Sequence, residues 1–97
     1  MKFSLEQLTQ KLHEELPLLR QRFSVKSLAI FGSVARRDPQ PNDLDLIVEF
    51  YEMPGLFEFI ALENHLSDKL GVKVDLLTLD SLKPRVSKNV VKEMVFV

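Results

Sequence analysis

Two aspartates separated by one leucine, Asp43 and Asp45, are the residues of this sequence best suited to chemistry. They open an apolar run that continues from Leu46 to Val48 and has the character of a β-strand. Side chains two apart in a strand point to the same side, so the two carboxylates should lie next to each other. Neighbouring carboxylates repel unless a cation lies between them, and oxygen ligands without sulfur favour Mg²⁺ or Mn²⁺. The pair therefore predicts a divalent-metal site.

A third carboxylate, Asp75, lies inside a later apolar run, between Val74 and Leu76. A charged residue in that setting costs stability unless it is paired or bound to a cation. If the strands that carry Asp45 and Asp75 are neighbours in one sheet, the three carboxylates could hold two Mg²⁺ ions together with the phosphates of a nucleotide. The alternative is that Asp75 marks an edge strand exposed to water, where charged residues are common.

The pair Gly32-Ser33 ends the apolar run from Leu28 to Phe31 and supplies a second set of polar atoms. Glycine allows a tight turn and the close approach of a phosphate, and Ser33, at the start of an expected helical turn, offers a hydroxyl and amides to phosphate oxygens. Arg36 would add positive charge suited to a triphosphate. Taken singly, Gly-Ser is a turn signal and Arg36 is a solvated side chain. Together with the aspartates they predict a nucleotide-binding site at Gly32, Ser33 and Arg36.

Hydrophobic periodicity places these residues in an α+β fold. A capping box at Ser4 and Gln7 begins a leucine-rich helix over about residues 4–15, which Pro17 then kinks or restarts to Arg22. The other expected elements are a helical turn over 33–36, strands over 26–31, 43–50 and 72–78, a helix over 56–70 that ends at Gly71, and a last helix that begins near Pro84 and includes Met94 and Val97. One-sided apolar alternation in the second and third strands predicts a mixed β-sheet with helices packed on one face and the acidic face open.

Length and composition restrict the class of protein. Ninety-seven residues predict one domain, residues 1–97, without a second core. Thirteen basic and fourteen acidic residues nearly balance, which argues against holding long nucleic acid by charge alone. The absence of cysteine fits a reducing compartment, and no apolar run approaches the span of a bilayer. We therefore expect a soluble cytoplasmic protein that makes no membrane contact.

The candidate metal-binding and nucleotide-binding residues also occur in a recognisable order along the chain. A strand leads to Gly32-Ser33, nine residues follow, Asp43 and Asp45 open a second strand, and Asp75 stands alone in a later one. This order resembles the minimal nucleotidyltransferases, the MNT or MntA-type antitoxins of the DNA polymerase β-like superfamily. The resemblance extends over most of the chain. Members often have Gly where Arg37 stands and Ser where Asn42 stands.

The resemblance implies transfer of AMP from ATP to a tyrosine on a partner HEPN-domain toxin, a helical ribonuclease that the AMP would silence. Asp43 and Asp45 would bind metal. Asp75 would bind the first of two Mg²⁺ ions and assist removal of the acceptor proton. One ion would lower the pKa of the acceptor hydroxyl, and the other would bind the triphosphate and the leaving pyrophosphate.

Two other functions stay open on the residues alone. The first is an antitoxin that neutralises its toxin by occlusion, with weak or absent catalysis. The second is transfer to a small molecule or to RNA, which the near-neutral charge and the lack of a second domain count against. A domain of this size has little to enclose a base or an acceptor, so we expect a partner to complete the pocket. Phe57 and the apolar segment 94–97 are the candidate contacts.

Overall fold

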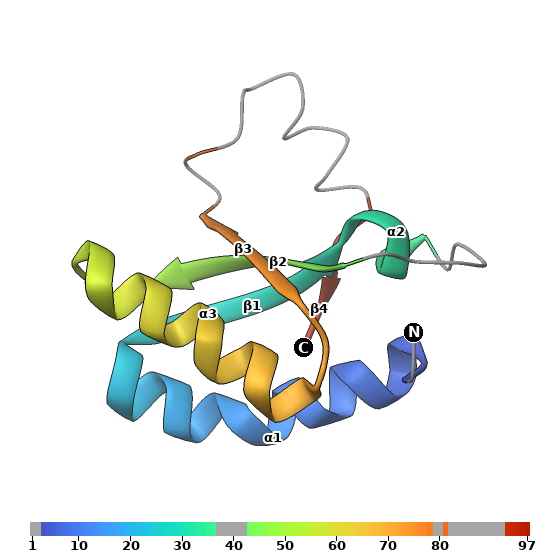
Figure 1. Ribbon diagram of the computed structural model, residues 1–97, viewed down its shortest axis with the longest axis horizontal. Coiled ribbons are helices and arrows are strands. Elements are labelled where there is room, and N and C mark those ends of the chain that lie inside the picture. Colours follow the sequence, from blue (N-terminus) through green and yellow to red (C-terminus); the bar gives the residue numbers. More distant parts are fainter. Residues whose placement is uncertain (1–2, 37–42, 79–80, 82–92) are drawn as a thin grey trace.

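A computed structural model describes residues 3–36, 43–78, 81 and 93–97 of the chain. In these residues helices and strands alternate as far as residue 78, and a further strand lies near the end of the chain (Figure 1). The elements are α1 (Leu5–Phe23), β1 (Val25–Phe31), α2 (Gly32–Ala35), β2 (Leu44–Phe50), α3 (Leu56–Leu70), β3 (Val74–Thr78) and β4 (Val95–Phe96). Neither long helix is apolar enough over a sufficient length to cross a bilayer.

The sheet has four strands in the order β3-β2-β1-β4. Strand β1 is antiparallel to both β2 and β4, whereas β2 and β3 are parallel. Parallel strands need a crossover connection, and α3 is the helix of that connection. Helices α1 and α3 lie on the same side of the sheet in Figure 1. The prediction of an α+β fold with a mixed sheet is therefore confirmed.

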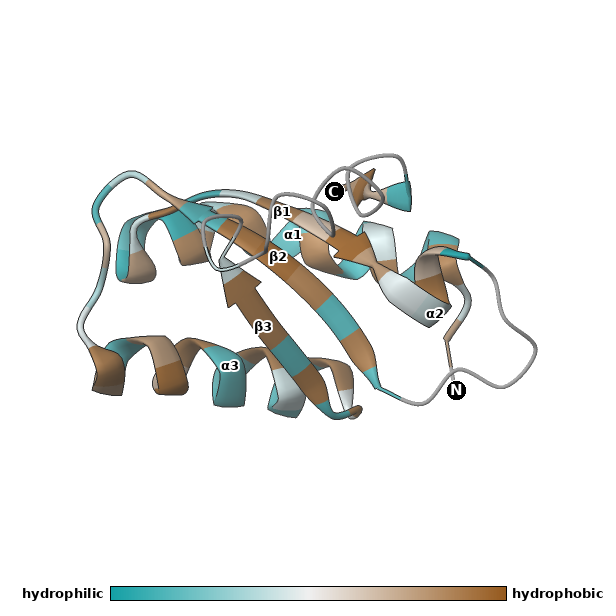
Figure 2. Ribbon diagram, turned by 90° about the horizontal axis from the view of Figure 1, so that it is seen from above, coloured by the Kyte–Doolittle hydropathy of each residue, from teal (hydrophilic) through white to brown (hydrophobic). Residues whose placement is uncertain are grey.

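The core lies between the sheet and these two helices. Every second residue of β2, namely Leu44, Leu46 and Val48, is buried there, and Figure 2 shows hydrophilic bands interrupting the apolar residues of β2 and β3. The helices contribute leucines at steps of three and four, Leu5, Leu8, Leu12, Leu16 and Leu19 from α1 and Leu62, Leu66 and Leu70 from α3. The opposite face of the sheet is not uniformly open, because Ala29 and Ile47 on it are also buried.

Helix α1 continues through Pro17 without interruption, so the predicted restart after residue 15 was wrong, whereas the predicted end at Arg22 lies within one residue of the observed end at Phe23. The helix begins with the predicted capping box, in which Ser4 and Gln7 exchange hydrogen bonds, and it continues to Phe23. Pro17 and His13, the residue whose carbonyl loses its helical donor, are both exposed. Water can satisfy that carbonyl, and burial of the leucine stripe on the other side outweighs the lost hydrogen bond.

The end of the chain also differs from the prediction. Residues 82–92, where the last helix was expected to begin, lie outside the described residues, but Val95–Phe96 form strand β4 rather than helix. Ala29 and Ile30 of β1 are their antiparallel partners, and the Val97 amide donates to the Leu28 carbonyl at 3.2 Å. Edge pairing thus satisfies backbone groups that β1 would otherwise expose.

Candidate functional site

The site centres on Asp45 and Asp75, which the sheet brings to neighbouring positions. Their Cα atoms are register partners in the parallel pair β2–β3, and Phe31 of β1 is the partner of Asp45 on its other side. Both aspartates alternate with buried core residues, so their side chains project from the face opposite α1 and α3, and both are partly exposed. In the described residues β3 is an edge strand and Asp75 is partly exposed, as the alternative also requires, but that alternative gives no reason for the position of Asp75 beside Asp45.

Electrostatics at this position disfavour the ionised form of Asp45. Its pKa is raised above the ordinary value of 3.8, first because partial burial removes water and then because Asp75 and Asp43 are negatively charged. The positive charge of Arg36 acts in the opposite direction and lowers this pKa. Excess negative charge gathered at one end of a sheet is the condition under which a cation would bind favourably.

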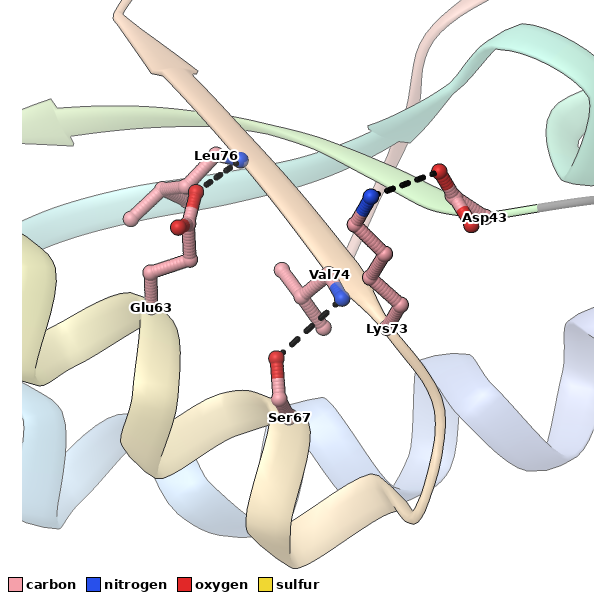
Figure 3. A network of polar contacts seen from close by, with 6 residues as sticks. All are labelled: Asp43, Glu63, Ser67, Lys73, Val74 and Leu76. Atoms are coloured by element: carbon pink, nitrogen blue, oxygen red, sulfur yellow. Dashed lines mark hydrogen bonds and ion pairs between the residues drawn. The ribbon is translucent and has the colours of Figure 1, made fainter.

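Asp43 stands in the bend just before β2, two residues from Asp45. Its carboxylate Oδ2 lies 3.8 Å from the Lys73 Nζ, an ion pair drawn in Figure 3. The Lys73 side chain is 74% exposed, so this pair contributes little stability and can open readily. No local pattern in the sequence pointed to Lys73 as a partner of Asp43, because the lysine approaches only through the β2–β3 pairing.

As metal ligands, the three aspartates would form a partial site rather than a closed one. Within the part of the chain that the structure describes, no three acidic or histidine side chains are grouped closely enough to hold one ion by themselves. Mg²⁺, however, is usually held by one or two carboxylates, with substrate phosphates and water supplying the other oxygens. Asp45 and Asp75 meet that requirement, and Asp43 could join them if it left Lys73. The residues therefore fit Mg²⁺ bound together with a nucleotide.

Gly32 lies directly against the Asp45 carboxylate. Its φ of +74° falls in the left-handed region, and a Cβ built on it would overlap the Asp45 Oδ2 and lie 3.2 Å from the Asp45 Cγ. Glycine is thus required at this position for two reasons, the left-handed backbone conformation and the close approach of the Asp45 side chain. The sequence predicted the turn but not its contact with Asp45. This contact places the start of α2 beside the acidic pair.

Ser33 and Arg36 occupy α2 and the residue that follows it, as the expected helical turn requires. The Ser33 hydroxyl makes no hydrogen bond with the described residues, and no side chain caps α2 at Phe31. Arg36 NH1 lies 3.3 Å from the Glu93 Oε2, so the segment before β4 reaches this end of the sheet. Sequence spacing offered no signal for Glu93, which is 57 residues away.

Comparisons with known proteins identify the family of this chain. A profile described as a nucleotidyltransferase domain matches residues 12–97. Protein adenylyltransferase MntA of Thermococcus cleftensis is 42% identical over 80 residues, which are 81% of this chain and 81% of that protein.

Two solved structures have the same fold. One, provisionally identified as a minimal nucleotidyltransferase, superposes with a TM-score of 0.79 at 33% identity and covers 97% of this chain and 96% of its own. The other is a complex of an MNT antitoxin with the tri-AMPylated HEPN toxin of Shewanella oneidensis. It has a TM-score of 0.66 at 21% identity, over 92% of this chain and 70% of that chain. At that identity the likeness concerns the fold alone.

Proposed function

Because the chain belongs to the nucleotidyltransferase domain family, we propose that it transfers AMP from ATP to a tyrosine of a HEPN-domain toxin and thereby acts as the antitoxin. The observation that carries the proposal is the placement of Asp45 beside Asp75, with Gly32 packed against Asp45. Similarity to MntA of Thermococcus cleftensis supports a protein as acceptor, and the HEPN complex with the same fold supports the class of partner. The cytoplasm is the compartment that we propose for this reaction.

Each residue of the site then has a role. Asp45, Asp75 and Asp43 would hold two Mg²⁺ ions, and the same oxygen ligands also suit Mn²⁺. When bound, Mg²⁺ would lower the pKa of the acceptor hydroxyl and neutralise charge on the triphosphate. The amides and hydroxyl at Gly32-Ser33 would bind phosphate oxygens, and Arg36 would add positive charge.

In the transfer step, the tyrosine oxygen would form a bond to the α-phosphorus of ATP while the bond from that phosphorus to the bridging oxygen breaks. Pyrophosphate would leave, and the proton of the tyrosine hydroxyl would pass to Asp75 or to water. The main contribution of this chain is to position groups, because phosphoryl-transfer catalysis depends chiefly on alignment and charge stabilisation. We propose that this single domain acts with its partner, which would supply the acceptor and enclose it.

The decisive experiment combines the protein with a HEPN-domain protein encoded beside it, Mg²⁺ and ATP, followed by mass spectrometry of the partner. AMP should appear on a partner tyrosine. The double variant Asp43→Asn/Asp45→Asn should leave the partner unmodified while the two proteins still co-purify. Asp68→Asn, which alters an exposed carboxylate on α3, is the matched control and should transfer AMP normally.

Other outcomes would select the other functions. If the wild-type protein blocks the partner's ribonuclease activity without modifying it, occlusion is the function. If only an RNA end or a small molecule is labelled, both antitoxin mechanisms fail.

A further inference from the structure

Among the described residues, strand β3 lies at the edge of the sheet, with β2 on one side only. Successive residues of a strand direct their backbone groups to alternate sides. The Leu44 amide donates to the Lys73 carbonyl at 2.9 Å, so residues 73, 75 and 77 direct their backbone groups toward β2. The amides of Val74 and Leu76 therefore point outward, one on each side of Asp75.

Two side chains of α3 accept these outward amides. The Val74 amide donates to the Ser67 Oγ at 3.1 Å, and the Leu76 amide donates to the Glu63 Oε2 at 3.0 Å. Figure 3 shows both acceptors directed from the helix to the strand. Both hydrogen bonds are partly buried, and the one to Glu63 has a charged acceptor, which makes it the stronger of the two.

The spacing of the two acceptors matches the spacing of the two donors. Glu63 and Ser67 are four residues apart on α3, a rise of about 6 Å. Val74 and Leu76 are two residues apart on β3, a rise of about 6.6 Å. The helix is itself fixed by Leu62 and other buried leucines. Two hydrogen bonds of matched spacing thus fix where β3 lies along the sheet.

The position of β3 decides where the Asp75 carboxylate lies. A shift of one residue in strand register moves every side chain to the opposite face, which would direct Asp75 into the core. Burial of Val74 and Leu76 already opposes such a shift, but an edge strand has backbone pairing on one side only and opens locally more easily unless its outer side is also bound. The bonds from α3 act on the two residues adjacent to Asp75 and not on Asp75 itself.

We propose that Glu63, together with Ser67, is a positioning residue for nucleotidyl transfer, which holds Asp75 beside Asp45 by binding the outer edge of β3. This inference rests on the metal role proposed above for Asp75. Glu63 would touch neither metal nor nucleotide.

The first measurement uses the metal-free protein and follows hydrogen exchange of the Asp75 amide by NMR. Glu63→Ala should lower the protection of this amide by about tenfold, because local opening of the edge strand becomes easier. Glu63→Gln keeps an oxygen acceptor and should retain the wild-type protection. Asp68→Ala removes an exposed carboxylate from the same helix and serves as the matched control. If Glu63→Ala proves unfolded by circular dichroism, Ser67→Ala provides the milder loss of one neutral hydrogen bond.

The second measurement is the affinity for Mn²⁺ in the presence of a non-hydrolysable ATP analogue, followed by electron paramagnetic resonance, because phosphate oxygens complete the ligands of this partial site. Glu63→Ala should bind Mn²⁺ about tenfold more weakly, while Glu63→Gln and Asp68→Ala bind as the wild type does. The positioning role would be overturned if Glu63→Ala left the exchange protection of the Asp75 amide unchanged. It would also be overturned if this variant lost that protection but bound Mn²⁺ with wild-type affinity. A wild-type protein that binds no Mn²⁺ would count against the proposed function, and the exchange of the Asp75 amide would then decide separately whether Glu63 holds this residue in place.

Discussion

Asp45 and Asp75 are partners in the parallel register of β2 and β3, so two carboxylates stand on adjacent strands and on the same face of the sheet. Thirty residues separate them in the sequence, and the crossover through α3 brings them together. Their mutual repulsion adds to the cost of burying Asp45, and both effects raise the pKa of Asp45. The metal-free site is therefore electrostatically unfavourable as folded.

Asp45→Asn should stabilise the metal-free protein at neutral pH. A carboxyl group with a raised folded-state pKa binds its proton more tightly in the folded than in the unfolded protein, so ionisation weakens the fold as pH rises through and above 3.8. The gain should be roughly 0.2–1 kcal/mol, as for other like-charge pairs on neighbouring strands. Thermal denaturation of both proteins in EDTA between acidic and neutral pH measures it.

The gain from this substitution should shrink toward zero below the ordinary aspartate pKa, where both states of the wild-type protein are protonated. Asp68→Asn, on the exposed side of α3, is the control for a general change in net charge. A gain that is the same at every pH would show that charge repulsion at Asp45 is not its cause.

Mg²⁺ with ATP should raise the melting temperature of the wild-type protein, because a ligand that binds only the folded state stabilises it. Asp45→Asn and Asp75→Asn should each lose most of that increase. Differential scanning fluorimetry with Mg²⁺-ATP, with ATP alone and with Mg²⁺ alone separates the two ligands. Equal increases in the wild type and in both variants would contradict the assignment of these carboxylates.

Gly32→Ala should abolish transfer at a modest cost in stability. The added methyl group must displace the Asp45 carboxylate, which can rotate away cheaply but then leaves its position beside Asp75. The left-handed backbone conformation adds about 1–2 kcal/mol of strain, to be measured by denaturation.

Gly71→Ala is the matched control, because Gly71 has a similar φ of +68° but no atom within 4 Å of an added Cβ. It should lose comparable stability and keep transfer activity. If Gly32→Ala transfers AMP as fast as the wild-type protein does, the contact of Gly32 with Asp45 is not required for the reaction.

Ser33→Ala should change the free energy of unfolding by no more than about 0.5 kcal/mol, since the hydroxyl makes no hydrogen bond with the described residues. ATP binding should nevertheless weaken by several-fold, because the hydroxyl is expected to contact phosphate. Isothermal titration calorimetry with Mg²⁺ and a non-hydrolysable ATP analogue measures the affinity. Destabilisation as large as that of a core substitution would assign Ser33 to the turn instead.

Local signals in the sequence were sufficient for much of the fold. The capping box at Ser4, the helix over 56–70 with Gly71 at its end, and the turn after Gly32 each depend on contacts within a few residues. Phe57, which the sequence offered as a candidate contact for a partner, has a side chain that is 87% exposed. Apolar residues recur at steps of three and four in the helices and at every second residue in the strands, and these two patterns were sufficient to predict the α+β class.

The errors arose where distant burial outweighed a local preference. Pro17 does not interrupt α1, because the leucine stripe on both sides of it is buried against the sheet. Val95 and Phe96 continue an apolar pattern that suits a helix, yet the free edge of β1 recruits them as a strand. Neither outcome can be derived from neighbours along the chain.

For the candidate site, the sequence was sufficient to select the residues that we propose for the chemistry, because carboxylates in apolar strands and glycine at a strand end cost stability. Only the tertiary structure decided how they meet. It set Asp75 beside Asp45 through parallel register, placed Gly32 against Asp45, and directed Lys73 to Asp43. The reason is physical: strand pairing and side-chain contact are fixed by the packing of segments tens of residues apart, and no local spacing in a single sequence specifies that packing.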